Sequence, residues 1–219
     1  MTFTLLQRCQ LLVHDWIYGN RIRVKSSNSI DIAFAERLRM KKVDILIKGS
    51  NNSLSIGRGS MVAKCKIRID GSNQRVEIGE DCLYHAGKIY LRYNSNQRIK
   101  IGDKTTIEDA YLLTDEDASI TIGRDCMFSK FVHLRAGDGH SVLDVATGKR
   151  INRARDITLG DRVWVGRAAC ILKGANIPES SIVGAHAVVT RQFDQPGSAI
   201  AGNPAVVVRS GLDWDRRML

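Results

Sequence analysis

Aromatic residues are scarce in this sequence, at 6% of 219 residues. Such a composition suits a narrow core of aliphatic side chains better than a wide core built from rings. Long apolar runs are also lacking, because none approaches the roughly 18 residues that would span a bilayer. The first residues are interrupted by Arg8, Gln10, His14 and Asp15, so they make a poor signal peptide. These absences favour a cytoplasmic protein without a transmembrane segment.

Paired cysteine motifs are absent too. The five cysteines form no CxxC pair and their number is odd, so disulfide and metal-binding roles have little support. Cys82 and Cys126 occupy the same position of two IGxDC units, where a small inward side chain is expected. We interpret these cysteines as buried, reduced thiols.

Acidic residues are outnumbered, with 23 against 33 lysines and arginines, and the formal net charge is +10. This charge favours polyanionic partners such as an acidic polysaccharide, an anionic lipid or a phosphorylated cofactor. No nucleic-acid-binding motif is present and the basic residues are spread along the chain, so no nucleic acid is expected. A basic but merely solvated surface explains the charge equally well.

What the chain does have is a six-residue repeat near its C-terminal end. An aliphatic residue returns at Leu159, Val165, Ile171, Ile177, Val183 and Val189. The fifth position of each unit is small, namely Val163, Ala169, Ala175, Ser181 and Ala187. Period six fits neither a helix nor an isolated strand, whose side-chain periods are 3.6 and 2. It predicts an all-β fold, a parallel β-helix with one short strand on each face of a triangular prism.

A longer repeat precedes the hexapeptides. Gly57, Gly79, Gly102 and Gly123 end similar segments 22, 23 and 21 residues apart, whereas three hexapeptides need 18. Each of these coils is therefore expected to carry extra residues that bulge outward at a polar GSN turn. The β-helix is predicted over residues 21–208.

The two ends of the chain differ from the repeat. An apolar stripe over residues 3–18 predicts a short amphipathic helix in a cap of residues 1–20, with docking on a membrane surface as a weaker alternative. Residues 209–219 form a C-terminal tail, either a short helix or disordered.

One segment breaks the rhythm. The interval from Gly123 to Gly160 is 37 residues, and the excess lies in 138–157, which is dense in Gly, Asp, Lys and Arg. A loop extruded from a rigid scaffold is a common place for functional residues. We expect the chemistry here.

The loop and the repeat together carry a resemblance. The motifs GHSV, GKRIN, VWVG, ILKG and AGNPA, over about residues 120–209, resemble the hexapeptide-repeat acyltransferases with a left-handed parallel β-helix. Among these, the sequence looks most like bacterial O-acetyltransferases of sugars and capsular polysaccharides, including the polysialic acid O-acetyltransferases. The resemblance implies a homotrimer with active sites between neighbouring subunits. The implied left-handed coiling runs against the usual right-handed crossover.

His140 is the predicted general base. It lies 24 positions before Trp164, as the resemblance requires of the catalytic histidine. A sugar hydroxyl that attacks a thioester must lose its proton, and histidine, with an ordinary pKa of about 6.5, accepts one near neutral pH. Asp138 could orient the imidazole, or it could be an ordinary turn residue. His133 could line the acceptor cleft or simply pack.

Trp164 is the second residue to which the resemblance gives a catalytic role, beside the thioester, and a tryptophan that fills a subunit groove is the alternative. Backbone N–H groups from Trp164 to Gly166 are candidates to stabilise the tetrahedral oxyanion.

The resemblance also implies acetyl-CoA as the co-substrate. The positions that match its binding residues are Gly166, Gly184, Ala185, Thr190, Arg191 and Arg209. Arg191 stands where the family has lysine and keeps the charge, whereas Val206 stands where the family often has a basic residue. The three histidines that hold zinc in the carbonic-anhydrase branch of this fold are not evident, so no metal is expected.

The leading interpretation is an acetyl-CoA-dependent O-acetyltransferase that acts on a hydroxyl of a bacterial capsular or other surface polysaccharide. An acetyltransferase for a small acceptor, such as a nucleotide-activated amino sugar or an antibiotic, is the first alternative. A non-catalytic solenoid scaffold is the second, against which the presence of His140 and Trp164 argues.

Overall fold

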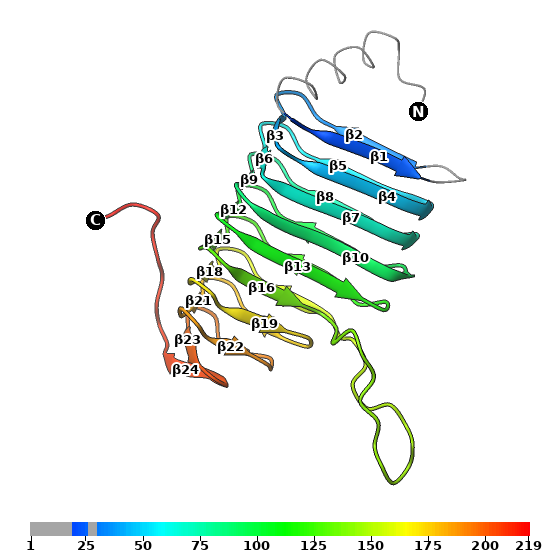
Figure 1. Ribbon diagram of the computed structural model, residues 1–219. Coiled ribbons are helices and arrows are strands. Elements are labelled where there is room, and N and C mark those ends of the chain that lie inside the picture. The colour runs from blue at the N-terminus through cyan, green and yellow to red at the C-terminus, as the bar shows by residue number, and fades with distance from the viewer. Residues whose placement is uncertain (1–18, 26–29) are drawn as a thin grey trace.

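The computed structural model describes residues 19–25 and 30–219, which form a β-helix with strands on three faces of a triangular prism (Figure 1). The cap helix expected over residues 3–18 lies outside these residues. The described part of the chain contains no helix, and hence none long and apolar enough to cross a membrane.

Each face of the prism is a stacked sheet, called here sheet A, B or C. Sheet A consists of β1 (Arg21–Lys25), β4 (Asp44–Ser50), β7 (Cys65–Ser72), β10 (Gly87–Ser95), β13 (Ala110–Asp115), β16 (Val132–Arg135), β19 (Cys170–Leu172) and β22 (Val188–Val189). Sheet B consists of β2 (Ile30–Phe34), β5 (Asn52–Ile56), β8 (Arg75–Ile78), β11 (Arg98–Ile101), β14 (Ile120–Ile122), β17 (Ile157–Leu159) and β20 (Asn176–Ile177). Sheet C consists of β3 (Arg39–Lys41), β6 (Met61–Ala63), β9 (Leu83–Tyr84), β12 (Thr106–Ile107), β15 (Met127–Phe128), β18 (Trp164–Val165), β21 (Ile182–Val183), β23 (Ala199–Gly202) and β24 (Ala205–Arg209).

The coil is left-handed. In Figure 1 the strands of sheet A run to the right at the front, the chain returns behind them to the left, and each coil lies below the previous one. Neighbouring strands of a sheet are parallel, apart from the antiparallel pair of β23 and β24 that ends sheet C. The predicted fold class is confirmed, including the hand that the family resemblance implied.

The core is a set of columns in which each coil places an aliphatic side chain on the one below. In sheet A the column runs through Ile45, Ile67, Ile89, Leu112, Leu134, Ile171 and Val189. All of these side chains are fully buried, as are the small corner residues from Val163 to Ala187 that the six-residue period selects. The described cysteines are free thiols, and burial raises the pKa of Cys82 and of Cys126 to about 11.

The extra residues of the N-terminal coils lie at the predicted GSN turns, but they do not bulge outward as expected. Strand partners in sheet A are 22 or 23 residues apart from β1 to β16, and 18 apart between β19 and β22. The difference lengthens the strands of sheet A, which reach nine residues in β10 against two in β22. The expected outward bulge is therefore wrong, because the added residues continue the sheet and only then turn, through Asn51, Asn73 and Asn96 at positive φ.

A buried polar stack fills the corner that these long strands create. Asn52, Gln74 and Gln97 are each at most 1% exposed. The Gln74 backbone N–H donates to Asn52 Oδ1 at 2.9 Å, and Gln74 Nε2 donates to Gln97 Oε1 at 3.0 Å. These hydrogen bonds link the amides from coil to coil, which lowers the free-energy penalty of burying them.

The C-terminal tail is extended and packs on sheet C. Trp214 is 7% exposed, and its Nε1 donates to the Arg162 carbonyl oxygen at 2.6 Å. Arg216 donates to Asp125 Oδ1 at 3.0 Å and to Thr106 Oγ1 at 2.7 Å. The tail is thus neither helical nor without contacts, and it closes over strands that lie far from it in sequence.

The stacked core predicts where side-chain truncation is costly. Val76→Ala, at a fully buried position of β8, should lower the free energy of unfolding by about 2 kcal/mol, because it leaves a void in an aliphatic column. Val208→Ala, at a 61% exposed position of β24, is the matched control and should change it by less than about 0.5 kcal/mol. Urea unfolding followed by circular dichroism measures both, and equal losses would contradict this picture of the core.

Candidate active site

The segment that interrupts the hexapeptide repeat forms an ordered arm. It leaves the prism after β16 of sheet A, rejoins it at β17 of sheet B and projects beyond the prism (Figure 1). Its two sides pair: the Ile151 N–H donates to the Val142 carbonyl at 2.9 Å, and Leu143 bridges Arg150 in antiparallel fashion. Asp144 closes the tip by accepting hydrogen bonds from the backbone and hydroxyl of Thr147. We call residues 136–156 the arm.

The base of the arm is held to the prism by Lys173 on one side, and by Glu116, which accepts from the Ala154 N–H at 2.9 Å and pairs with Arg150, on the other. Lys173, on the turn after β19, donates from Nζ to Asp138 Oδ2 at 2.6 Å and to the Asn152 carbonyl at 3.1 Å. Asn152 Nδ2 in turn donates to the same Asp138 oxygen and to the His140 carbonyl, at 2.7 and 2.8 Å. These bonds fix the backbone around His140.

The hydrogen-bond network around Asp138 stabilises its charged form. Burial acts to raise the pKa of Asp138, but the hydrogen bonds from Lys173 and Asn152 outweigh it and hold the pKa below its ordinary value. A depressed carboxyl pKa means that the anchor is intact at neutral pH and is lost as the pH falls below about 4. Here the carboxylate orders the arm, and an orienting role toward the His140 imidazole stays a prediction.

His140 is exposed and lines a hollow of about 330 Å³ beneath the arm. Arg92 and Asp115 also line it, and they form an ion pair at 3.2 Å. Asp115 is 91% buried as a side chain, and its Oδ2 has no hydrogen-bond partner within the described structure. Gly137 passes so close that a Cβ there would lie 2.8 Å from the Asp115 Cβ. The hollow therefore offers an imidazole, a guanidinium and a carboxylate to one ligand.

Trp164 lies on a different face from the arm. It belongs to β18 in sheet C, is 36% exposed and has its ring centroid 6.2 Å from that of Trp214. In Figure 1 the arm leaves the right-hand end of sheet A, whereas β18 lies at the left edge.

Two of the three backbone donors expected to stabilise the oxyanion already have partners in the next coil. The N–H groups of Trp164 and Gly166 donate to the carbonyls of Ser181 and Val183 in the next coil, at 2.9 and 2.8 Å. Coil stacking thus uses both donors. Gly166 itself is needed because a Cβ would approach the Ala185 nitrogen to 2.7 Å.

The expected coenzyme-binding residues lie toward the C-terminal end of the stack. Gly184 and Ala185 follow β21 at the corner between sheets C and A, and Thr190 and Arg191 follow β22. Arg209 ends β24. All but Gly166 and Gly184 are exposed, and Val206 is 44% exposed. The structure places Gly166 after β18 and the other five residues on the last two turns, but it does not test their role.

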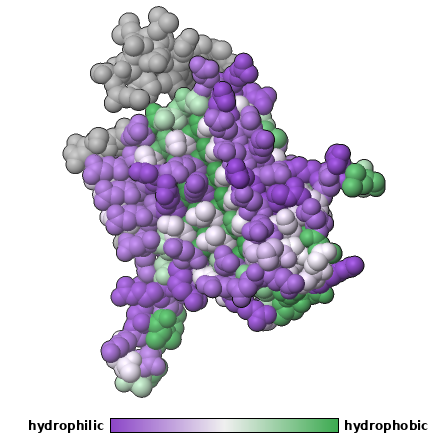
Figure 2. Space-filling model, turned by 180° about the vertical axis from the view of Figure 1, so that it is seen from behind, coloured by the Kyte–Doolittle hydropathy of each residue, from purple (hydrophilic) through white to green (hydrophobic). Residues whose placement is uncertain are grey.

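The arm carries apolar side chains on its outside. Val142, Leu143 and Ile151 are 51%, 57% and 66% exposed, and Val145 is fully exposed. A paired arm that holds this much apolar surface in solvent is typical of a segment that contacts another molecule. Figure 2 shows apolar surface on the projecting arm.

The sequence predicts the position of the arm but not the contacts that hold it. Lys173, Asn152 and Asp115 carry no signal in the sequence, since nothing there shows which residues they meet. Among the described residues, no three histidine, cysteine or acidic side chains gather as metal ligands.

No family model matches the chain. It is 32% identical to the polysialic acid O-acetyltransferase of Neisseria meningitidis over 192 residues, which cover 88% of this chain and 87% of that protein. It is 34% identical over 140 residues to the polysialic acid O-acetyltransferase of Escherichia coli O1:K1, covering 58% of this chain and 45% of that one.

Two solved structures are similar throughout. The polysialic acid O-acetyltransferase OatWY matches with a TM-score of 0.83 and 30% identity, over 90% of this chain and 92% of its own. The polySia-specific acetyltransferase NeuO matches with a TM-score of 0.79 and 31% identity, over 89% and 88%.

The anchor predicts a specific loosening of the arm. Lys173→Met removes the donor to Asp138 and Asn152, so amide hydrogen exchange over residues 138–152 should accelerate at least about fivefold. Lys149→Met, which removes an exposed lysine of the arm itself, is the control and should leave exchange unchanged. Exchange followed by mass spectrometry measures both, and an unchanged rate in Lys173→Met would show that the arm is ordered by other contacts.

Proposed function

Because the chain belongs to the hexapeptide-repeat O-acetyltransferases, in the family that includes the polysialic acid O-acetyltransferases, we propose that it acetylates a surface polysaccharide. Acetyl-CoA is the donor and a sugar hydroxyl is the acceptor. The observation that carries this proposal is the single ordered arm, which holds His140 on a hollow that also contains a cation and a carboxylate.

His140 acts as the general base. Its imidazole takes the hydroxyl proton while the sugar oxygen attacks the thioester carbonyl, which gives a tetrahedral intermediate. Collapse of this intermediate breaks the C–S bond, and the imidazolium returns the proton to the departing thiolate. The products are an acetyl ester and free coenzyme A, with no covalent enzyme intermediate.

The donor lies along the last coils. The exposed corner at Ala185, the turn at Thr190–Arg191 and the end of β24 at Arg209 form its binding residues, with Gly166 and Gly184 where the chain stacks too closely for side chains. The two arginines supply positive charge for its phosphates. Trp164 flanks the thioester, and its packing on Trp214 gives the ring a fixed position.

The active site is completed by a second copy of the chain in a homotrimer. Within one chain the arm and Trp164 leave different faces of the prism, and the arm carries exposed apolar residues at its tip. A neighbouring subunit that covers Val142 and Leu143 would bring its own Trp164 to the His140 of the first. A cyclic arrangement repeats this contact three times and closes.

The acceptor is an acidic sugar polymer. The net charge of +10 favours a polyanion, and the relatives named above act on polysialic acid. The buried, reduced thiols fit a cytoplasmic enzyme that modifies the polymer before export. A small acceptor, such as an activated amino sugar, is the alternative.

Replacing the base should abolish turnover. His140→Gln should lower kcat for thiol release from acetyl-CoA, with polysialic acid as acceptor, by about 10²- to 10⁴-fold, because proton removal becomes uncatalysed. His85→Gln, at a half-buried corner of an N-terminal coil, is the matched control and should keep wild-type activity. Activity within a few-fold of wild type in His140→Gln would exclude this residue as the base.

A site shared between subunits predicts complementation. His140→Gln and Trp164→Ala should each be inactive as homotrimers, yet co-refolded mixtures contain sites with an intact histidine from one chain and an intact tryptophan from the next. Random assembly of equal amounts makes about a quarter of the sites intact, so about a quarter of wild-type activity should return. Light scattering checks the trimer, and a mixture that stays inactive would place the whole site within one chain.

A further inference from the structure

The outer surface of sheet A differs from the other two faces in charge. On strands β4 to β16, six cations alternate with the buried core positions, namely Lys48, Lys66, Arg68, Lys88, Arg92 and Arg135. Three carboxylates share this surface, Asp44, Asp70 and Asp115. β1 adds three more cations, Arg21, Arg23 and Lys25. Nine cations against three anions leave +6 of the chain's +10 on one flat face.

Aromatic rings run between these charges. The Tyr90 and Tyr111 rings meet edge to face at 5.4 Å, and Tyr111 meets the exposed His133 in the same way at 5.8 Å. Lys88 Nζ lies 5.5 Å from the centroid of the Tyr111 ring. Rings with polar tips beside cations suit a sugar chain, whose apolar C–H faces alternate with hydroxyl and carboxylate groups.

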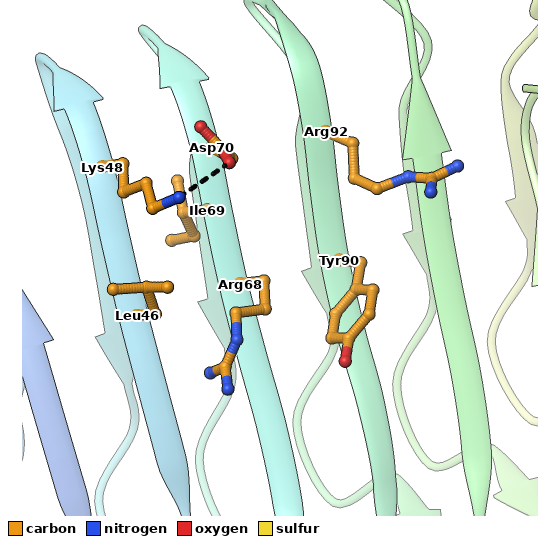
Figure 3. Close-up of a pocket in the computed structure, with 7 residues that line it drawn as sticks. All are labelled: Leu46, Lys48, Arg68, Ile69, Asp70, Tyr90 and Arg92. Atoms are coloured by element: carbon orange, nitrogen blue, oxygen red, sulfur yellow. Dashed lines mark ion pairs between the residues drawn. The ribbon is translucent and has the colours of Figure 1, made fainter.

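A hollow of about 250 Å³ opens on this face, and Figure 3 shows the side chains that line it. Arg68 and Tyr90 lie on neighbouring strands, and Lys48 pairs with Asp70 at 3.5 Å. Arg92 extends from the hollow across the next strand, and it also lines the hollow that contains His140. Nη2 atoms of Arg92 and Arg135 lie 3.7 Å from where a Cβ of Gly139 would be. The basic face therefore continues to the base of the arm.

The other faces are unlike it. Sheet B presents small polar residues, such as Ser53, Ser55 and Thr158, together with three cations and two carboxylates that nearly balance, namely Arg75, Arg98, Lys100, Asp31 and Glu77. Sheet C presents an apolar column that includes Met61, Leu83, Met127 and Ile182. From behind, Figure 2 shows an apolar and weakly polar band along the stack between hydrophilic flanks. Faces with a lower net charge than sheet A suit contact between subunits, whereas two copies of sheet A would repel each other.

We propose that the outer face of sheet A is an extended binding track for the acidic polysaccharide, which leads the polymer to the arm. The proposal rests on the proposed function, since it assigns that acceptor a place. Cations on successive coils recur at about the 4.8 Å spacing of neighbouring strands, so a polyanion laid along the stack meets one positive row after another. The enzyme then selects long acidic chains over short ones.

The test is direct binding of fluorescently labelled polysialic acid, measured by anisotropy. Lys66→Glu/Lys88→Glu, two exposed cations distant from the arm, should raise Kd at least about tenfold, because two attractions become repulsions. Lys41→Glu/Lys100→Glu makes the same change of net charge on sheets C and B and should alter Kd less than about twofold. Neutral dextran should not bind.

Kinetics separate this track from the chemistry. In Lys66→Glu/Lys88→Glu, KM for the polymer should rise in step with Kd, whereas kcat at saturation and KM for acetyl-CoA should change little. Wild-type Kd and KM in this variant, or equal losses in the control pair, would overturn the proposal. Tighter binding of single-stranded DNA of equal length would overturn it in favour of a nucleic acid.

The same measurements distinguish failure of the proposed function from failure of the binding track. An enzyme that releases no thiol with any sugar acceptor, yet binds polysialic acid through Lys66 and Lys88, would lose the assigned reaction but keep the track. If acetyl transfer proceeds and polymer binding is unchanged in Lys66→Glu/Lys88→Glu, the proposed reaction is supported and the binding track is wrong.

Discussion

The structure depends on one constraint, that each coil must place the same kind of inward side chain on the coil below. The column from Ile45 to Val189 in sheet A shows the consequence, because every member is fully buried and every neighbour is in register. A register slip by one residue would turn the whole aliphatic set to solvent. The inward positions are thereby fixed, and the outward positions are released to vary from face to face.

The same constraint explains why a long insertion is tolerated at the arm. Ile120 still pairs with Ile157 across 37 residues, so sheet B continues as if nothing had been inserted. The arm needs its own contacts, since it lies outside the columns, and Lys173 of the following coil and Glu116 of the preceding one provide them. Lys173 can do this although its side chain is only 18% exposed, because its charge is paired with Asp138 and it donates a second hydrogen bond to the Asn152 carbonyl.

The period of six predicted the prism, its inward residues and its small corners, because these follow from local spacing alone. The position of the arm followed from the interval that breaks the period. The greater length of the N-terminal strands could not be predicted in this way. Gly, Ser and Asn at 49–51 and 71–73 are equally typical of a bulge and of a strand that turns late. The Asp138–Lys173 pair and the packing of Trp214 on Trp164 also could not be predicted, because each joins residues that only the coil brings together.

The geometry of stacked coils explains why polymer binding and catalysis lie on different parts of the molecule. A face that runs parallel to the coil axis can hold many sugars at once, but its flat strands cannot surround a reacting atom. The arm supplies the missing wall, and it leaves the prism from sheet A itself, so a chain lying on that sheet reaches His140 without crossing a corner. Several weak charge contacts along the track raise the local concentration of hydroxyls at the arm without holding any single sugar tightly. Such an arrangement favours repeated acetylation along one polymer, because the chain can shift by one sugar and exchange each row of cations for the next.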